Sequence, residues 1–186
     1  KGFGITESGI VYGTDPKSAL TLKATNNSGN NTDITATLEG LSPGQVYYYR
    51  AYAKTSGGIG YGKTLSFTMP AVLPQFANAP VANMSYINWT LSFSATIASD
   101  GGSEITERGF RYKRDSNPDW KYIKADNDPD SNVFTAELAG QYQLPIGNYT
   151  AEAYMVNSVG MVTMSCNNGA TIRTDQLVQV SASIDS

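Results

Sequence analysis

Histidine is absent from all 186 residues of this sequence, and cysteine occurs once, as Cys166. Without histidine the chain cannot form a Ser/His/Asp triad, a Cys/His pair or a zinc site built on imidazole. A single cysteine cannot close an intramolecular disulfide, so the fold must be held together by packing alone. These absences exclude the commonest hydrolytic mechanisms and favour a bacterial source over a disulfide-stapled eukaryotic secreted module.

Long apolar runs and basic clusters are also missing from the chain. No run of about 18 apolar residues is present, so we expect no membrane insertion within this segment. The net charge is −3, and no cluster of lysine and arginine provides the positive face that phosphate contacts need. We therefore do not expect a nucleic-acid partner.

The residues that are abundant favour strands and tight turns over helices. The sequence contains 12 Tyr, 18 Gly and 8 Pro, together with many Thr, Ser, Asn and Val residues. Its length suits two modules of about 90 to 100 residues, each burying a core of its own. The composition thus predicts an all-β protein with two small domains.

An internal repeat supports this division. The segment ITESGIVY at 5–12 recurs as ITERGFRY at 105–112, a shift of 100 residues. The match continues at shifts of 100 or 102 residues, where Leu38, Gly40, Pro43, Tyr47, Ala51, Tyr52, Ser56 and Gly58 correspond to Leu138, Gly140, Pro145, Tyr149, Ala153, Tyr154, Ser158 and Gly160. The sequence therefore predicts two copies of one β-sandwich module.

Apolar residues alternate with polar ones in segments that we expect to form half-buried strands. Residues 91–97 show this alternation in the second copy, and 34–38 show it in the first. Residues 47–53 form a further alternating set, which corresponds to 149–155 in the second copy. Each copy can therefore supply inward-facing residues from two sheets.

The stretch between the copies predicts a connection. Residues 69–80 include three prolines, which remove backbone donors and favour extended backbone. We expect a short, stiff link that leads into a strand near Val81. The predicted organisation is a module at 1–70, a complete module at 71–175 and a strand-like tail at 176–186.

These segments resemble the fibronectin type III-like repeats that occur in tandem in bacterial surface proteins. The resemblance covers nearly the whole chain and rests on SDGGSEITERGFRY at 99–112, LEGLSPGQVYYYRAYA at 38–53 and the NSVG turn at 157–160. It implies two immunoglobulin-like β-sandwiches. It also implies a tyrosine corner in each copy, in which the phenol of Tyr47 or Tyr149 bonds to nearby backbone.

The first copy departs from the family pattern because it begins at its third strand, with nothing before Lys1 to supply the first two. The tail at 176–186 resembles the second-strand segment at 91–99, and its alternating apolar residues are Val178, Val180, Ala182 and Ile184. Burying one such side chain stabilises a fold by roughly 1.5 to 3 kcal/mol. Losing four would cost about as much as the ~5–15 kcal/mol stability of a whole domain, so we expect the first copy to need a replacement strand.

Two explanations of the missing strands stay open. The strands precede Lys1 in a longer natural protein, and the tail leads into a third repeat. Alternatively, the tail is a donor strand that passes to a neighbouring molecule, head to tail or in a reciprocal swap. The 12 residues from Asp175 to Ser186 reach roughly 40 Å, less than two end-to-end modules, which argues against a fold-back within one chain.

Two loop motifs have spacings that suggest ligands. The segment GGIGYGKT at 57–64 fits the phosphate-loop spacing, but LSFT at 65–68 predicts a strand where a phosphate loop needs a helix, so we interpret it as a hairpin. Asp126, Asp128 and Asp130 have the alternating spacing of a calcium loop, although its glycine and glutamate are missing. The acidic segment is interpreted as an exposed turn or a weak calcium site, and no cofactor is expected.

Trp120 and Tyr122 alternate with Lys121 on a predicted edge strand. Both rings facing solvent would form a stacking platform for a sugar, whereas aromatic residues in sandwiches usually cover one end of the core. The leading hypothesis is a non-catalytic spacer or adhesion module of a surface-exposed or secreted bacterial protein, which binds a protein partner or itself. The alternative hypothesis is a carbohydrate-binding accessory module of a glycan-processing system.

Overall fold

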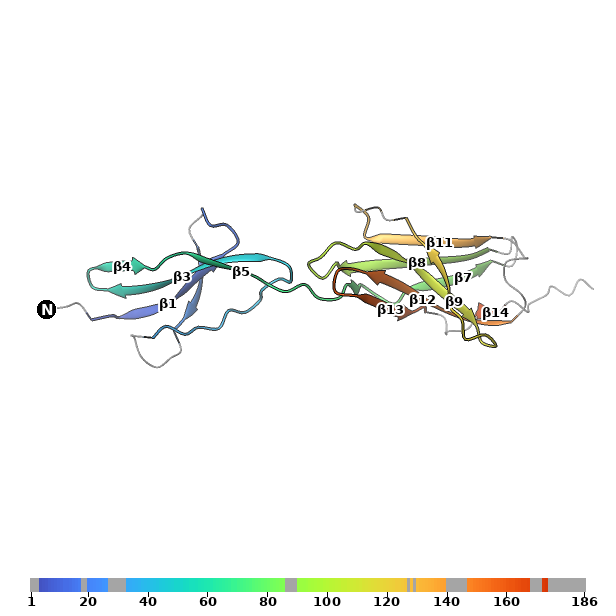
Figure 1. The fold of residues 1–186 in the computed structure, drawn as a ribbon, viewed down its shortest axis with the longest axis horizontal. Coiled ribbons are helices and arrows are strands. Elements are labelled where there is room, and N and C mark those ends of the chain that lie inside the picture. Colours follow the sequence, from blue (N-terminus) through green and yellow to red (C-terminus); the bar gives the residue numbers. More distant parts are fainter. Residues whose placement is uncertain are drawn as a thin grey trace, which may run out of the picture. The chain divides into compact units, whose positions relative to one another are not determined.

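The computed structural model of the chain describes residues 4–17, 20–26, 33–85, 90–126, 128, 130–139, 147–167 and 172–173. The regular secondary structure of these residues consists of β-strands alone (Figure 1). None of these residues belongs to a helix long and apolar enough to cross a membrane. The chain forms two compact units, Lys1–Val72 and Leu73–Ser186, which divide two residues after the predicted boundary at 70.

The described part of the N-terminal unit contains one antiparallel sheet, in the order β2-β1-β3-β4, with β5 also paired to β3. Its strands are β1 (Glu7–Gly13), β2 (Leu22–Thr25), β3 (Val46–Thr55), β4 (Gly58–Tyr61) and β5 (Leu65–Thr68). The repeated ITE motif leads into β1, which pairs with β3 from Glu7↔Lys54 to Gly13↔Tyr48.

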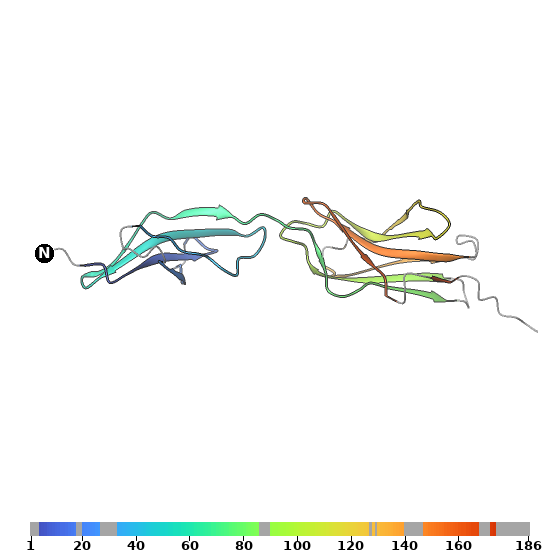
Figure 2. The ribbon, with the colours of Figure 1, turned by 90° about the horizontal axis from the view of Figure 1, so that it is seen from below.

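The C-terminal unit contains two antiparallel sheets that form the two layers seen in Figure 2. The first has the order β10-β9-β12-β13, with β14 paired to β12, and the second has the order β11-β8-β6, with β7 paired to β8. The strands are β6 (Gln75–Phe76), β7 (Val81–Ser85), β8 (Thr90–Ser99), β9 (Glu107–Arg114), β10 (Lys121–Lys124), β11 (Val133–Ala139), β12 (Asn148–Val156), β13 (Met161–Ser165) and β14 (Ile172–Arg173).

The core of the C-terminal unit lies between these two sheets. Phe93 of β8 stacks on Phe110 of β9 with 5.0 Å between ring centroids, and Phe110 lies 5.2 Å from Phe134 of β11. The buried residues of this core are Ala82, Leu91, Phe93, Ala95, Phe110, Tyr112, Phe134, Tyr149, Ala151, Ala153, Met155 and Cys166. The strands predicted over 91–97 and 149–155 are therefore confirmed.

The strand predicted over 34–38 is wrong. These residues lie outside every strand, whereas the corresponding β11 of the second copy pairs with β8 over seven positions, Val133↔Thr96 to Ala139↔Thr90. A strand forms only beside a neighbour that accepts and donates its backbone hydrogen bonds. In the described part of the N-terminal unit no second sheet provides that neighbour.

The connection between the two units belongs partly to the second one. Within the predicted link at 69–80, β6 pairs with the end of β8 through an irregular register. Pro74 and Pro80 are fully buried. The link is thus shorter than predicted, while the strand expected near Val81 is confirmed as β7.

Candidate functional site: an open sheet face in the N-terminal unit

One face of the N-terminal sheet corresponds to the face that β8 and β11 cover in the C-terminal unit. Residues directly opposite each other on paired strands share a face, so the registers of β1, β2, β3 and β5 define its members. They are Ser8, Ile10, Tyr12, Leu22, Ala24, Tyr47, Tyr49, Ala51, Ala53, Leu65 and Phe67. All but Ser8 are aliphatic or aromatic, and we call this surface the open face.

The open face is more exposed than its counterpart at several positions, although Tyr12 and Tyr47 are buried in it. Phe110 and Ala153 in the C-terminal unit are both 0% exposed, whereas the corresponding Ile10 and Ala51 are only half-buried. Leu65, at the edge of the open face, is 48% exposed. Exposed apolar patches are typical of interaction sites, which makes the open face the candidate site.

A shallow hollow of about 270 Å³ lies at the β3–β4 edge of the open face. Its lining includes Gly60 and Gly62, which have no side chains, at positions that Val162 and Met164 hold in the second copy. Ile34, from the segment 33–39 that forms no strand, also lines it. The hollow can accept apolar side chains, and a backbone segment lies beside it outside any described ladder.

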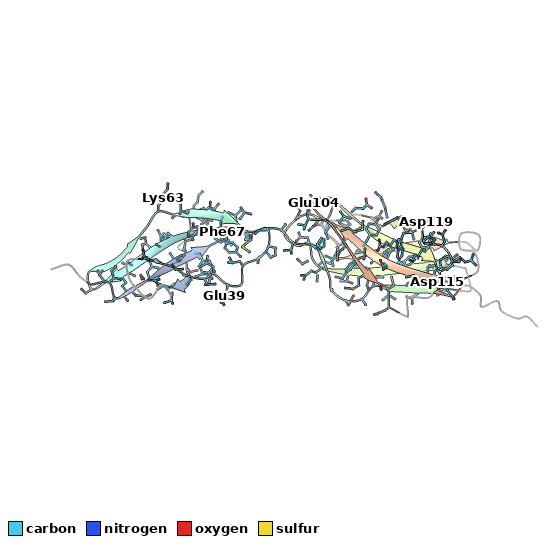
Figure 3. The ribbon with its side chains drawn as sticks, turned by 60° about the horizontal axis from the view of Figure 1, so that its bottom comes forward. Glu39, Lys63, Phe67, Glu104, Asp115 and Asp119 are labelled. Atoms are coloured by element: carbon cyan, nitrogen blue, oxygen red, sulfur yellow. The ribbon has the colours of Figure 1, made fainter. Side chains whose placement is uncertain are left out.

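Hydrogen bonds fix the segment 33–39 near its start and just after its end, although none of its residues belongs to a strand. The Thr35 amide donates a hydrogen bond to Asn26 Oδ1 at 3.1 Å. At the other side the Ser42 amide donates to the Tyr47 hydroxyl at 2.9 Å, which is the backbone-to-phenol bond of a tyrosine corner. Tyr47 in turn stacks on Phe67, labelled in Figure 3, with 5.8 Å between ring centroids.

The second predicted corner is described only in part. Tyr149 is 3% exposed, and its ring centroid lies 6.3 Å from that of Tyr112. Pro145 lies outside the described residues. Burial raises the pKa of the Tyr149 hydroxyl above its usual value. The tail residues Val178, Val180, Ala182 and Ile184 also lie outside the described residues.

The opposite face of the N-terminal sheet carries an interaction that sequence reasoning missed. The Tyr52 hydroxyl donates to Glu7 Oε1 at 2.7 Å, and Lys23 Nζ lies 3.7 Å from the same oxygen. The bond to Glu7 raises the pKa of Tyr52 to about 12 and lowers the pKa of Glu7. A Cβ on Gly9 would contact the Tyr52 ring, so glycine is needed beneath it.

The second copy repeats this arrangement. The Tyr154 hydroxyl donates to Glu107 Oε1 at 2.8 Å, and Lys124 Nζ donates to Glu107 Oε2 at 2.7 Å. Burial and the bond to Glu107 raise the pKa of Tyr154, and a Cβ on Gly109 would clash near its hydroxyl. We call this tyrosine–glutamate pair, Tyr52 with Glu7 in the first copy and Tyr154 with Glu107 in the second, the tyrosine lock. The shared E-x-G of the two ITE motifs, together with the matching tyrosines, is the sequence signal for it.

The predicted aromatic platform is only partly open. Trp120 precedes β10 and is half-buried, with the Arg111 guanidinium carbon 4.3 Å and Lys113 Nζ 4.9 Å from its ring centroid. Tyr122, on the edge strand β10, is 50% exposed and contacts Tyr154 edge-on at 5.4 Å. The structure thus leaves Tyr122 available, while two side chains of the protein itself contact the Trp120 ring.

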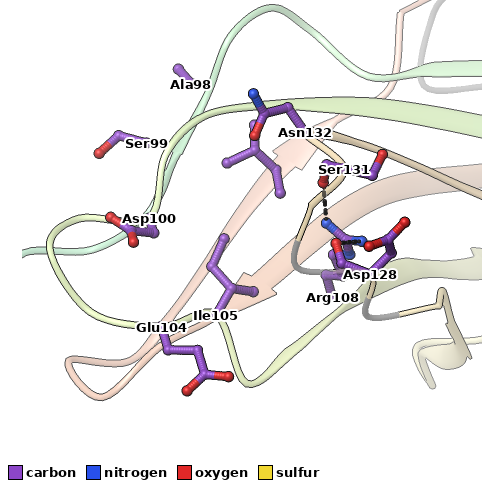
Figure 4. A pocket seen from close by; sticks show the side chains of 10 residues that line it. Ala98, Ser99, Asp100, Glu104, Ile105, Arg108, Asp128, Ser131 and Asn132 are labelled. Carbon is purple, nitrogen blue, oxygen red and sulfur yellow. Dashed lines mark hydrogen bonds between the residues drawn. The ribbon is translucent and has the colours of Figure 1, made fainter.

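The acidic loop after β10 is organised by a buried arginine. Arg108 is 3% exposed, and its Nε donates to the carbonyl of Asp126 at 2.9 Å. Its other two nitrogens donate to the carbonyls of Ser131 and Asp128, each at 2.8 Å (Figure 4). Its guanidinium carbon also lies 5.4 Å from the Phe134 ring centroid. These carbonyl oxygens already accept hydrogen bonds from the positively charged guanidinium, which weighs against a calcium ion at the same place.

The carboxylates of this loop form no cluster. Asp126, Asp128 and Asp130 are exposed. Within the described ranges no three acidic or cysteine side chains are grouped so that they could hold a metal ion. A cavity of about 410 Å³ lies beside the loop, with Ile97, Ile105 and Arg108 among its lining residues (Figure 4). The calcium site stays a prediction without geometric support.

The remaining candidates show no catalytic arrangement. Burial raises the pKa of the Cys166 thiol to about 11, which leaves little thiolate at neutral pH. The segment 57–64 runs through β4 toward β5, and Leu65–Thr68 is a strand, as the hairpin interpretation requires. No helix therefore follows the glycine-rich segment.

Comparisons with known proteins bear on the fold. Searches with the sequence find no matching family model and no matching curated protein. Among solved structures, the chain is similar to the FN1–FN3 domains of chicken CNTN1, with a TM-score of 0.52 and 15% sequence identity. The match covers 87% of this chain and 57% of that chain. The similarity shows the fold alone, which is that of tandem fibronectin type III-like modules. The C-terminal unit has both sheets of the β-sandwich that the internal repeat predicts, whereas the described part of the N-terminal unit has one.

Proposed function

We propose that this chain is a non-catalytic structural and interaction segment, a spacer or adhesion unit, of a surface-exposed or secreted bacterial protein. Its N-terminal unit binds partners by accepting a β-strand on the open face. The observation that carries this proposal is the exposure of apolar residues on the open face beside a segment that forms no strand.

The physical case rests on what an added strand would gain. Each apolar side chain that it buries contributes about 25 cal/mol per Å² removed from water. Its backbone would also pair with residues 33–39, which belong to no described ladder. Main-chain pairing with alternate side chains in pockets is the usual form of β-strand addition. The C-terminal unit supports the proposal because its own β8 and β11 cover the equivalent face.

The chemistry of the described residues supports a role without catalysis. The thiol of Cys166 is buried with a raised pKa. Arg108 is committed to three loop carbonyls. The hydroxyls of Tyr52 and Tyr154 are bound to carboxylates. These groups support the fold, and none is paired with a base in a cleft.

Hydrogen exchange across a concentration series tests strand acceptance. In dilute solution we expect fast exchange at the amides of 33–39, because no ladder protects them, and slow exchange at the amides of β11. Raising the concentration should slow exchange at 33–39 alone, in step with a rise in mass by light scattering. Fast exchange at 33–39 in every condition, with a constant monomer mass, would refute the proposal.

Carbohydrate binding by the C-terminal unit is the second candidate function. It is favoured by the exposed ring of Tyr122 next to the half-buried Trp120, since sugar rings stack on exposed aromatic faces. A glycan array with Trp120→Ala and Tyr122→Ala tests it. The matched control is Tyr61→Ala, because Tyr61 is 51% exposed and also lies under an arginine, with Arg50 at 4.0 Å. Binding lost in both C-terminal variants and kept in the control would support this function.

A further inference from the structure

We infer that the strand accepted by the open face is residues 178–186 of a second copy of this chain, paired antiparallel with 33–39 in the register that β8 takes on β11. The inference rests on the proposed function and names the partner of that site. It follows from the repeat and from the chain path in the C-terminal unit.

The tail has the sequence of the strand that covers the equivalent face. Aligning VQVSASIDS at 178–186 with LSFSATIAS at 91–99 gives four identities in nine positions, namely Ser181/Ser94, Ala182/Ala95, Ile184/Ile97 and Ser186/Ser99. The four alternating apolar residues of the tail fall on Leu91, Phe93, Ala95 and Ile97. The first three of these are 0%, 2% and 2% exposed in β8. The tail therefore places apolar residues where β8 has buried ones.

The repeat also fixes the register. In the C-terminal unit Ala136 lies opposite Phe93, and Leu138 lies opposite Leu91. The first copy aligns with the second at a shift of 100 residues in this region, and the tail aligns with β8 at a shift of 87. Ala36 should therefore lie opposite Val180, with Ile34 opposite Ala182 and Leu38 opposite Val178. Ile34 would leave the hollow beside Gly60 and take the place that Phe134 has against Phe110.

The donor is assigned to a second copy because of where the tail leaves the C-terminal unit. The chain enters this unit at Gln75, which pairs with Ser99, and the neighbouring Asp100 carbonyl accepts a hydrogen bond from Asn157, directly after β12. It leaves at β14, which pairs with Asn148 and Tyr149 at the other end of β12. These ends are separated by about 23 Å of strand, whereas the four residues 174–177 reach roughly 14 Å. A tail that comes from a second copy does not have to cover this distance.

Cysteine cross-linking between differently tagged chains tests the register. In a Cys166→Ala background, one chain carries Ala36→Cys and the other carries Val180→Cys or Gln179→Cys. The Gln179 variant is the matched control, because neighbouring residues of a strand point to opposite faces. We expect at least several-fold more cross-linked heterodimer for 36–180 than for 36–179 after mild oxidation. Equal yields, or a higher yield for 36–179, would overturn the inference.

A full-length Val180→Asp chain separates this inference from the proposed function, with Gln179→Asp as its control. We expect Val180→Asp to abolish concentration-dependent protection of 33–39, and Gln179→Asp to keep it. If Val180→Asp protects 33–39 as fully as the unchanged chain does, the open face accepts a different strand, so the inference is wrong while the proposed function stands. If the unchanged chain shows no protection at any concentration, both are wrong.

Discussion

The two units present the same central pair of strands to different surroundings. The register of β1 with β3, Glu7↔Lys54 to Gly13↔Tyr48, matches that of β9 with β12, which begins at Glu107↔Val156. In the C-terminal unit the inner residues of this pair are buried under a second sheet. In the N-terminal unit Tyr12 and Tyr47 are buried, but the other apolar inner residues of the pair, Ile10, Tyr49, Ala51 and Ala53, are only half-buried on the open face. Strand pairing is thus determined within the repeat, whereas burial depends on the sheet opposite.

The buried hydrophobic cluster of the N-terminal unit lies on the other face of its sheet. It consists of Val11, Leu20 and Tyr52, with Tyr48 packed against them. Val11 and Tyr52 belong to the face opposite the open face, because Val11 pairs with Arg50 and Gly9 pairs with Tyr52. On the open face Tyr12 and Tyr47 are buried as well, but Ile10 is only half-buried. Truncating Ile10 should consequently cost less than truncating its counterpart in the C-terminal unit.

The largest contrast is expected between Phe110→Ala and Ile10→Ala, at matching positions of the repeat. Removing the fully buried Phe110 ring should cost about 3–5 kcal/mol, whereas truncating the half-buried Ile10 should cost about 1–2 kcal/mol. Denaturant unfolding measures both. Both tryptophans lie in the C-terminal unit, so their fluorescence reports the first variant and far-ultraviolet circular dichroism reports both. Equal costs would show that the open face is already covered in the monomer.

A second comparison replaces a residue of the C-terminal unit by its N-terminal counterpart, because Ser8 has the position in the first copy that Arg108 has in the second. Arg108→Ser would leave the carbonyls of Asp126, Asp128 and Ser131 without their shared donor. The three hydrogen bonds that a buried charged group makes would be lost, and we expect a loss of about 2–4 kcal/mol in the unfolding free energy of the C-terminal unit. Tryptophan fluorescence during denaturation measures it.

The control for this exchange is Lys121→Ser, on an exposed position of β10. A surface substitution of this kind should change stability by less than about 0.5 kcal/mol. A similar small effect for Arg108→Ser would mean that water replaces the guanidinium at the loop carbonyls, and that the arginine does not organise the acidic loop.

Much of this fold was predictable from the sequence, because the repeat and the alternation are local properties. The residues at 91–97 and 149–155 alternate strictly, and each forms one side of the C-terminal core. Residues 34–38 alternate just as well but form no strand, because a strand also requires a hydrogen-bonding partner from elsewhere. Alternation reports which face a strand would bury and carries no information on whether its neighbour is present.

The candidate site was predictable to a smaller extent. The tail and its resemblance to 91–99 pointed to a strand that the first copy needs, but not to the location of the exposed surface. The alternation of Trp120 with Tyr122 left open whether both rings face solvent or cover one end of the core. It could not show the contact of Arg111 with the indole, which forms only after β9 and β10 have paired. The spacing of three aspartates around Asp128 likewise gave no sign that Arg108 would bind the loop carbonyls.

A third pair of matching substitutions should cost the two units equally, because the tyrosine locks are the same in both. At Gly9 and at Gly109 an added Cβ would meet a backbone carbonyl of the neighbouring strand and the tyrosine above it. Gly9→Ala and Gly109→Ala should each cost about 1–3 kcal/mol through overpacking, as measured by denaturant unfolding. Gly4→Ala is the control, since a Cβ there meets nothing within 4 Å. A loss confined to Gly109→Ala would show that the N-terminal lock is loose.

The smallest expected difference lies between the two lock tyrosines themselves, in alkaline titration. The bond to Glu7 raises the pKa of Tyr52 to about 12. Burial, and to a smaller extent the bond to Glu107, raises the pKa of Tyr154. Since tyrosine in an unfolded chain titrates near pH 10, each lock stabilises its unit fully below about pH 10 and loses that contribution as the pH rises through the folded pKa. Tyrosinate absorbance, compared among the unchanged chain, Tyr52→Phe and Tyr154→Phe, should show two tyrosines that titrate late, one of them missing in each variant. Titration of Tyr52 together with the exposed tyrosines near pH 10 would show that its bond to Glu7 is not kept in solution.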